Sequence, residues 1–275
     1  MKFTRINVMN FENALYGMRN PKNSWHLSDS QFGVAHLGEV HEIAQEVAQA
    51  WVEADGVPQD SEVYEGLLDS YTEMLIENGV NTALIQGDYC CYSFIGPKDM
   101  RLAKTLIRGG SEHRKFLRQI MVAVDITAPL YWWKEFDTYK VGTVANSTST
   151  MHKLAETPIT LDCFEIDDYD KSVFTNPEEI EYFIQFLEGL RRKFLDTKDV
   201  RYWKELIRWL PEGWLQTRTV TMNYENLLGM CSAGQRRFHK LNEWSGKDNP
   251  ELPNFISFAR TLPYAADFIF LDEQE

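Results

Sequence analysis

Apolar residues recur at helical spacing in three stretches of the N-terminal half. In residues 36–54 they fall every three or four positions and a Gly and a Pro follow soon after, which predicts a helix. A second amphipathic stretch ends at Asn78 and Gly79, a pair typical of a helix C-terminus. A third helix is predicted between Pro97 and Gly109.

The pattern then alternates between strands and helices. Residues 116–127 are apolar and β-branched, as in a buried strand, and Ala128 and Pro129 begin a helix that carries Trp132 and Trp133. Further helices are predicted over residues 178–197, 200–210 and 224–244, and a strand over residues 216–223. This order of elements indicates one mixed α/β domain, with the helices near the N-terminus as an added lobe.

Charge limits the kinds of ligand that the chain can bind. Asp and Glu number 41 against 28 Lys and Arg, and the formal net charge is −13, which repels nucleic acid and anionic membranes. An anionic ligand must therefore be small, such as a mononucleotide or a phosphate-bearing cofactor, and must meet a local group of cations. The chain shows no secretory signal and no apolar run near membrane-spanning length, so we expect a cytoplasmic protein. Its four cysteines form no C-x-x-C pair, so we expect ordinary reduced thiols and no metal site.

Two segments far apart in the sequence carry candidate chemistry. Residues 128–150 are rich in short hydroxyl and amide side chains, which can approach a polar ligand closely. The second segment places Arg236, Arg237, His239 and Lys240 within five positions of the predicted helix. This cluster is either an anion site or a solvated basic helix face that is paired with the protein's own carboxylates.

The order of segments over residues 97–245 resembles the flavin-dependent thymidylate synthases, most of all their divergent phage and prophage relatives. The resemblance is carried by Glu112-His113, Ala128-Pro129, Leu210-Pro211, and Thr221 with Asn223. It implies an α/β (α+β) fold with a mixed, largely antiparallel sheet flanked by helices. It also implies a single domain over residues 1–275, in which residues 30–95 are a helical insertion.

The family's signature motif falls on residues 138–151, where most of its charged groups are replaced. Its Arg-His-Arg becomes Thr-Tyr-Lys at residues 138–140, and its Glu becomes Asn146. Thr148 keeps the hydroxyl group of a family Ser. A Lys keeps the charge of an Arg but loses its planar fork of donors, so the motif has exchanged ionic contacts for neutral hydrogen bonding.

The resemblance also implies which residues meet each ligand. The family Asn that touches flavin is present as Asn223, but the Arg two positions later is Glu225. The flavin contacts that the resemblance implies are Glu112, His113, Tyr139, Lys140 and Asn223. The residues expected around the nucleotide are Glu135, Asn146, Thr148, Ser149, Thr150, Arg236 and Arg237. Those expected to be catalytic are Arg236, Arg237 and Thr148.

Enzymes of the resembled family pass hydride from NADPH to FAD and transfer a one-carbon unit from methylene folate to C5 of dUMP, in a homotetramer. The resemblance therefore implies a thymidylate synthase-like methyltransferase that uses FAD, NADPH and a folate. The eroded motif leaves an alternative, a catalytically inactive relative that binds a nucleotide or a partner protein. A third interpretation is that the polar loop packs at a subunit interface.

Overall fold

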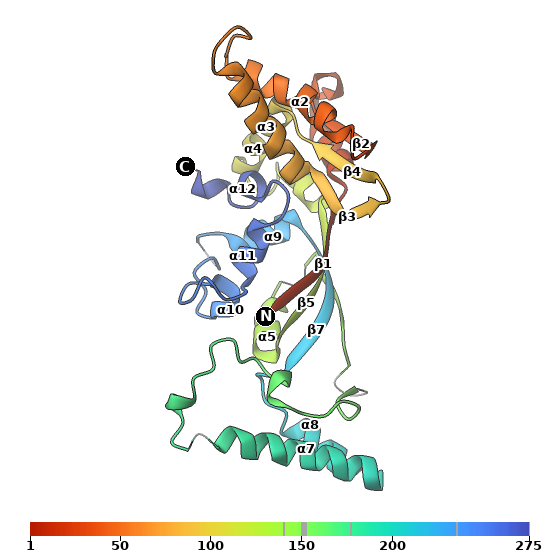
Figure 1. The fold of residues 1–275 in the computed structure, drawn as a ribbon, viewed down its shortest axis with the longest axis vertical. Helices are drawn as coiled ribbons and strands as arrows, with labels where there is room; N and C mark the ends of the chain where they lie inside the picture. The colour runs from red at the N-terminus through yellow and green to blue at the C-terminus, as the bar shows by residue number, and fades with distance from the viewer. Residues whose placement is uncertain (140, 150–152, 177, 235, 275) are drawn as a thin grey trace.

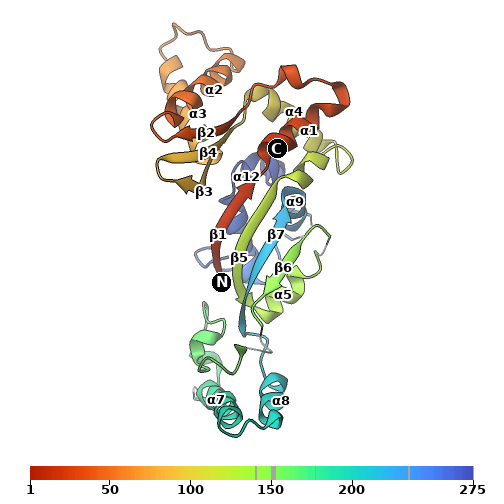
Figure 2. The ribbon, with the colours of Figure 1, turned by 90° about the vertical axis from the view of Figure 1, so that its right-hand side faces the viewer.

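Four strands form an antiparallel sheet along the long axis of the molecule (Figures 1 and 2). The computed structural model describes residues 1–139, 141–149, 153–176, 178–234 and 236–274. The strands, in their order across the sheet, are β1 (Lys2–Met9), β5 (Met121–Pro129), β7 (Leu215–Asn223) and β6 (Val144–Ser147). All neighbouring pairs are antiparallel, which confirms the predicted fold class of a mixed α/β protein with a largely antiparallel sheet.

Helices cover one face of this sheet, while Figure 2 shows the strands unobstructed from the other side. Val122, Val124 and Ile126 of β5 are buried beneath the helices, and the residues between them face outward. On the outward face Asp125 accepts a hydrogen bond from Thr219 of β7 at 2.6 Å. The helices of this body are α1 (Phe11–Arg19), α4 (Pro97–Arg108), α5 (Leu130–Phe136), α9 (Tyr224–Cys231), α10 (Asn242–Ser245), α11 (Phe255–Arg260) and α12 (Ala265–Phe268).

Residues 31–94 form a lobe at one end of the molecule (Figure 1). Its elements are β2 (Gln31–His36), α2 (Val40–Ala54), α3 (Tyr64–Gly79), β3 (Val80–Gln86) and β4 (Tyr89–Phe94). The two predicted helices are present, but the lobe also contains a three-stranded antiparallel sheet in the order β2-β4-β3, which the sequence pattern did not predict. Its buried residues form a cluster separate from the main core.

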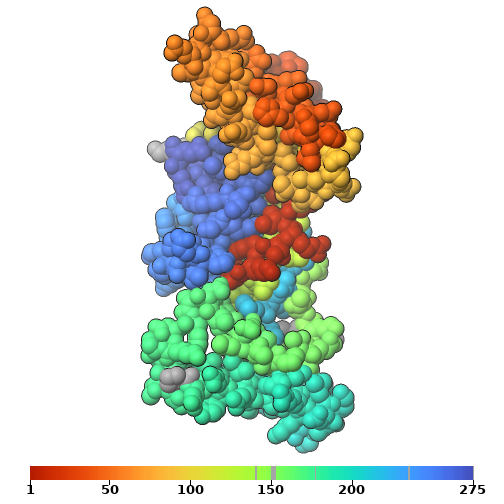
Figure 3. Space-filling model, viewed as in Figure 1, coloured from red at the N-terminus to blue at the C-terminus, as the bar shows by residue number. Residues whose placement is uncertain are grey.

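Two helices, α7 (Glu179–Thr197) and α8 (Val200–Arg208), lie at the opposite end. Figure 3 shows this region adjoining the body at the end opposite the lobe of residues 31–94. Its buried cluster is small and consists of Leu154, Ile159, Phe164, Leu187 and Leu206. None of the described helices is both long and apolar enough to span a membrane.

Three predictions about secondary structure were wrong. The predicted helix over residues 224–244 ends at Cys231, because Ser232 is extended and its carbonyl accepts the N–H groups of both Arg236 and Arg237 in a turn. The predicted strand over residues 116–127 begins later, since η3 (Lys115–Gln119) precedes it. Part of the expected polar loop is instead strand β6, which pairs with β7.

Three tryptophans that would be candidates for a subunit interface if they were exposed, Trp132, Trp133 and Trp214, pack within one chain. Trp132 and Trp133 are fully buried and pack in an edge-to-face arrangement, with ring centroids 5.0 Å apart. Trp214 is partly buried and packs edge-on against Phe164. These side chains therefore build the cores of the protein and are not a reason to expect a tetramer.

Candidate functional site

The side chain of Arg236 lies at the centre of a group of aromatic and charged residues that we call the Arg236 cluster: Glu135, Tyr139, Arg236, His239 and Trp244. Nη1 of Arg236 donates to Glu135 at 2.8 Å. The guanidinium carbon lies 5.3 Å from the centre of the Tyr139 ring and 5.8 Å from that of Trp244, within the range of cation–π attraction. The tertiary fold thus brings together parts of both segments that the sequence analysis singled out.

The charged groups of the Arg236 cluster shift one another's pKa values. The hydrogen bond from Arg236 lowers the pKa of Glu135, so the carboxylate is ionised at neutral pH. Burial and the adjacent Arg236 lower the pKa of His239, which favours the neutral imidazole. Nδ1 of His239 accepts the backbone N–H of Leu241 at 3.1 Å, so the proton of the neutral ring resides on Nε2, 3.7 Å from Glu135.

Arg237 points away from this cluster and is buried. Its Nε donates to the carbonyl oxygen of Cys231 at 2.9 Å, and its Nη groups contact Asp272 at 2.6 Å and Glu273 at 3.1 Å. Only 7% of the residue is exposed, and its guanidinium lies 5.4 Å from the ring of Phe270. Arg237 therefore fastens the C-terminal segment to the body. Because it has this structural role, we do not count it among the nucleotide contacts that we propose below.

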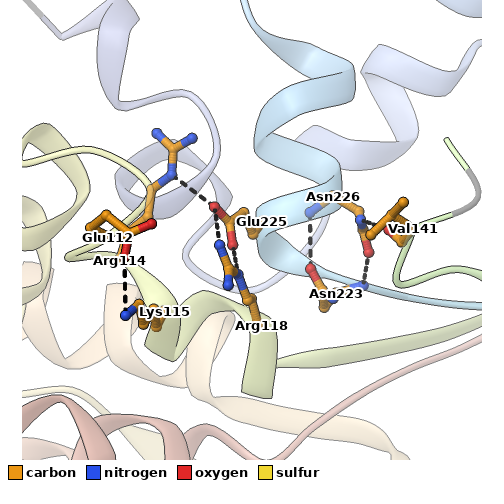
Figure 4. Close-up of polar contacts among 8 residues, drawn as sticks. All are labelled: Glu112, Arg114, Lys115, Arg118, Val141, Asn223, Glu225 and Asn226. Carbon is orange, nitrogen blue, oxygen red and sulfur yellow. Dashed lines mark hydrogen bonds and ion pairs between the residues drawn. The ribbon is translucent and has the colours of Figure 1, made fainter.

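Asn223, the predicted flavin contact, is the N-cap of α9. Its Oδ1 accepts the backbone N–H of Asn226 at 2.9 Å, and Oδ1 of Asn226 accepts the backbone N–H of Asn223 at 3.1 Å. The amide of Asn226 also donates to the carbonyl of Val141 at 2.7 Å (Figure 4). The reciprocal capping box fixes the start of α9, and the bond from Asn226 to Val141 ties the polar loop to it.

Two arginines converge on Glu225 in the first turn of α9 (Figure 4). Nε of Arg114 contacts one oxygen of Glu225 at 3.3 Å, and Arg118 of η3 contacts both. Burial would raise the pKa of Glu225, but the hydrogen bonds from Arg118 and Arg114 outweigh it and the pKa is lowered. These two arginines were not predicted from the sequence, although they lie four residues apart just before a predicted strand.

The remaining predicted ligand contacts lie outside the Arg236 cluster. Asn146 is exposed on β6. Thr148 and Ser149 line a cavity of about 330 Å³ between the sheet and residues 153–163, and the backbone N–H of Thr148 donates to Thr217 at 2.9 Å.

Glu112 and His113 line a larger cavity of about 570 Å³ beside α1. Glu112 is exposed and pairs with Lys115 at 3.2 Å. The predicted contacts Lys140 and Thr150 lie outside the described residues.

Within one chain, then, Glu135, Tyr139 and Arg236 come together, while Asn223, Thr148 and Glu112 belong to three other places. Over the part of the chain that the structure describes, no three His, Cys, Asp or Glu side chains are grouped so as to hold a metal ion.

Comparison with known proteins gives a distant likeness. No protein-family model matches the chain, and no curated protein matches it. A solved structure of the flavin-dependent thymidylate synthase ThyX from Helicobacter pylori, complexed with FAD and dUMP, is 14% identical with a TM-score of 0.45, over 87% of this chain and 96% of that one. A second structure of ThyX from the same organism, also with FAD and dUMP, is 12% identical with a TM-score of 0.45, over 90% of this chain and 98% of that one. The likeness is too distant to assign a role to any residue.

Proposed function

We propose that the chain is a ThyX-like protein that binds a deoxyuridine-type mononucleotide at the Arg236 cluster. The observation that carries this proposal is the position of the Arg236 guanidinium over Tyr139 and Trp244, with its side chain 23% exposed. The partly exposed ring of Tyr139 can stack on a pyrimidine, whereas Trp244 is fully buried, and an arginine can hold a phosphate through two N–H donors.

The carboxylate of Glu135 would compete with an incoming phosphate for Arg236. Its carboxylate already occupies Nη1 of Arg236, whereas Nη2 makes only a long contact of 3.5 Å with the hydroxyl of Thr138. An incoming phosphate would take up the second amino group and compete with Glu135 for the first. Neutral His239 places an Nε2–H donor 3.7 Å from the same carboxylate, and a small movement brings it into hydrogen-bonding distance of Glu135 when Arg236 turns to the ligand.

One-carbon transfer to C5 of the nucleotide, with FAD, NADPH and methylene folate, is the reaction implied by the sequence resemblance, and it is our first candidate activity. The described residues do not fit FAD well, because a flavin diphosphate at α9 would meet the carboxylate of Glu225, and both nearby arginines contact that carboxylate. The side-chain oxygen of Asn223 is also engaged in capping. We therefore derive no chemical step through FAD.

The poor fit of the residues near α9 to FAD favours a second candidate, a catalytically inactive relative that binds nucleotide or a partner without flavin chemistry. Calorimetry with dUMP and with FAD, together with NADPH oxidation and tritium release from C5-labelled dUMP, separates the two. Binding of dUMP alone supports the second candidate, and NADPH-dependent tritium release removes it.

The nucleotide site itself is tested by Arg236→Gln, which should weaken dUMP binding about tenfold or more through loss of charged hydrogen bonds. The matched control is Arg208→Gln on α8, where the arginine pairs with Glu205 one helical turn earlier and is not part of the Arg236 cluster. Equal affinity of dUMP for the parent and for folded Arg236→Gln would refute the site.

Assembly and location remain proposals of the same kind. We propose a homo-oligomer, a tetramer if the resemblance holds, and a cytoplasmic location. The proposed assembly is supported by apolar side chains that stand exposed close to the site in sequence: Val141 at 89%, Val144 at 67% and Phe238 at 66% exposure. Sedimentation that shows only a monomer at micromolar concentration would count decisively against it.

A further inference from the structure

A cavity of about 430 Å³ lies against α4 and α9, and none of the residues of the Arg236 cluster lines it. Its walls come from α4, the segment before η3, α9 and the C-terminal segment, and half of the lining residues are aliphatic. The apolar lining residues are Ile107, Leu228, Ile269 and Leu271. Arg108, Arg114, Ser232 and Asp272 supply its polar groups. A volume of this size falls within the usual range for small-molecule sites.

Arg114 presents its terminal amino groups away from Glu225. Its contact with Glu225 is made through Nε at 3.3 Å, and Figure 4 shows both Nη atoms on the opposite side of the guanidinium. The side chain is 24% exposed, so it is held in position by the surrounding protein. The Nε edge of the guanidinium is therefore engaged by Glu225, and the two Nη groups on the opposite edge point away from that carboxylate.

The charges around the cavity favour an anion. Arg114, which lines the cavity, and Arg118 share the single carboxylate of Glu225, so this group carries one positive charge in excess. The carboxylate that lines the cavity, Asp272, is bonded to Arg237 at 2.6 Å, which offsets its charge. In a chain of net charge −13 this is a local surplus of positive charge beside an apolar surface.

We propose that this cavity binds a small organic anion, a phosphate or carboxylate group carried on an apolar ring. The anionic group accepts hydrogen bonds from the Nη atoms of Arg114, and the ring packs on the aliphatic wall formed by Leu228 and Ile269. Both halves of the ligand are required, because a free phosphate gains no apolar burial and a neutral ring gains no charged hydrogen bond. The site goes beyond the proposed nucleotide function and uses none of its residues.

The test measures binding of phenyl phosphate to the full chain by calorimetry, with inorganic phosphate and phenol as half-ligands. We expect phenyl phosphate to bind at millimolar or lower concentration and each half-ligand to bind at least about tenfold more weakly. Arg114→Gln should weaken phenyl phosphate about tenfold or more. Arg118→Gln is the matched control, because Arg118 also contacts Glu225 but does not line the cavity, and it should change the affinity less than about threefold.

Filling the cavity gives a second variant that keeps every arginine. Leu228→Trp should abolish phenyl phosphate binding while dUMP binding is retained. Arg236→Gln should weaken dUMP binding while phenyl phosphate binding is retained. Thermal unfolding of each variant establishes that it is folded. The proposal is overturned if phenyl phosphate fails to bind the parent at millimolar concentration, if Arg114→Gln and Arg118→Gln weaken it equally, or if folded Leu228→Trp binds it as the parent does.

Discussion

Truncating each of the adjacent arginines Arg236 and Arg237 should lower the stability to a different extent, and Arg237→Ala should have the larger effect. The substitution removes a buried guanidinium that donates to the carbonyl of Cys231 and pairs with Asp272 and Glu273. Loss of a hydrogen bond to a buried carbonyl costs about 1–3 kcal/mol. Breaking a fully buried ion pair costs about 3–5 kcal/mol, but Asp272 and Glu273 are 46% and 33% exposed and regain water. We therefore expect a total loss of about 2–4 kcal/mol in the free energy of unfolding.

The assay is urea unfolding followed by tryptophan fluorescence, which reports on the body because Trp132, Trp133 and Trp244 are buried in its core. Arg236→Ala is the matched control, since its partner Glu135 is 39% exposed and the loss should stay near 1 kcal/mol. The assignment of a structural role to Arg237 is refuted if Arg237→Ala unfolds within about 0.5 kcal/mol of the parent, or if Arg236→Ala costs more.

Three further predictions concern the stability of the fold outside the Arg236 cluster. The pKa of Glu188 is lowered to about 2, chiefly by its hydrogen bond from Arg191, so this stabilisation is present above the ordinary carboxyl pKa and lost as pH falls toward 2. The loss is on the order of 1–2 kcal/mol after solvent screening, and Glu188→Gln should show a flatter decline in stability between pH 5 and pH 2 than the parent; parallel curves would contradict this. Asn223→Ala removes the N-cap of α9 and should cost about 1–2 kcal/mol in urea unfolding, and a change near zero would show that the cap is not stabilising. Gly142→Ala places a methyl group about 3.0 Å from Oδ1 of Asn226 at a φ of 83°, so it should lower the unfolding free energy by about 1–2 kcal/mol, and unchanged stability would refute the strain argument.

Helices with a strong local pattern were predicted well, because their signals lie within a few turns of chain. α2, α4 and α7 appear where apolar spacing and terminal Gly or Pro residues place them, and the ends differ by a few residues at most. The buried strand β5 followed by α5 with its two tryptophans was also predicted from local composition. These features depend on the local periodicity of apolar residues, which can be read directly from the sequence.

The sequence alone thus determined the class of fold, the main helices and β5, and two segments worth attention. Only the tertiary structure decided that Arg236 meets Glu135 from 101 positions earlier, that Arg237 meets Asp272 instead, and that Glu225 is shared by two arginines more than a hundred positions before it. It also ended α9 at Cys231 and paired β6 with β7. The physical reason is that propensity and periodicity act over one or two turns, whereas an ion pair or a strand pairing forms wherever folding brings the groups together, at any separation along the chain.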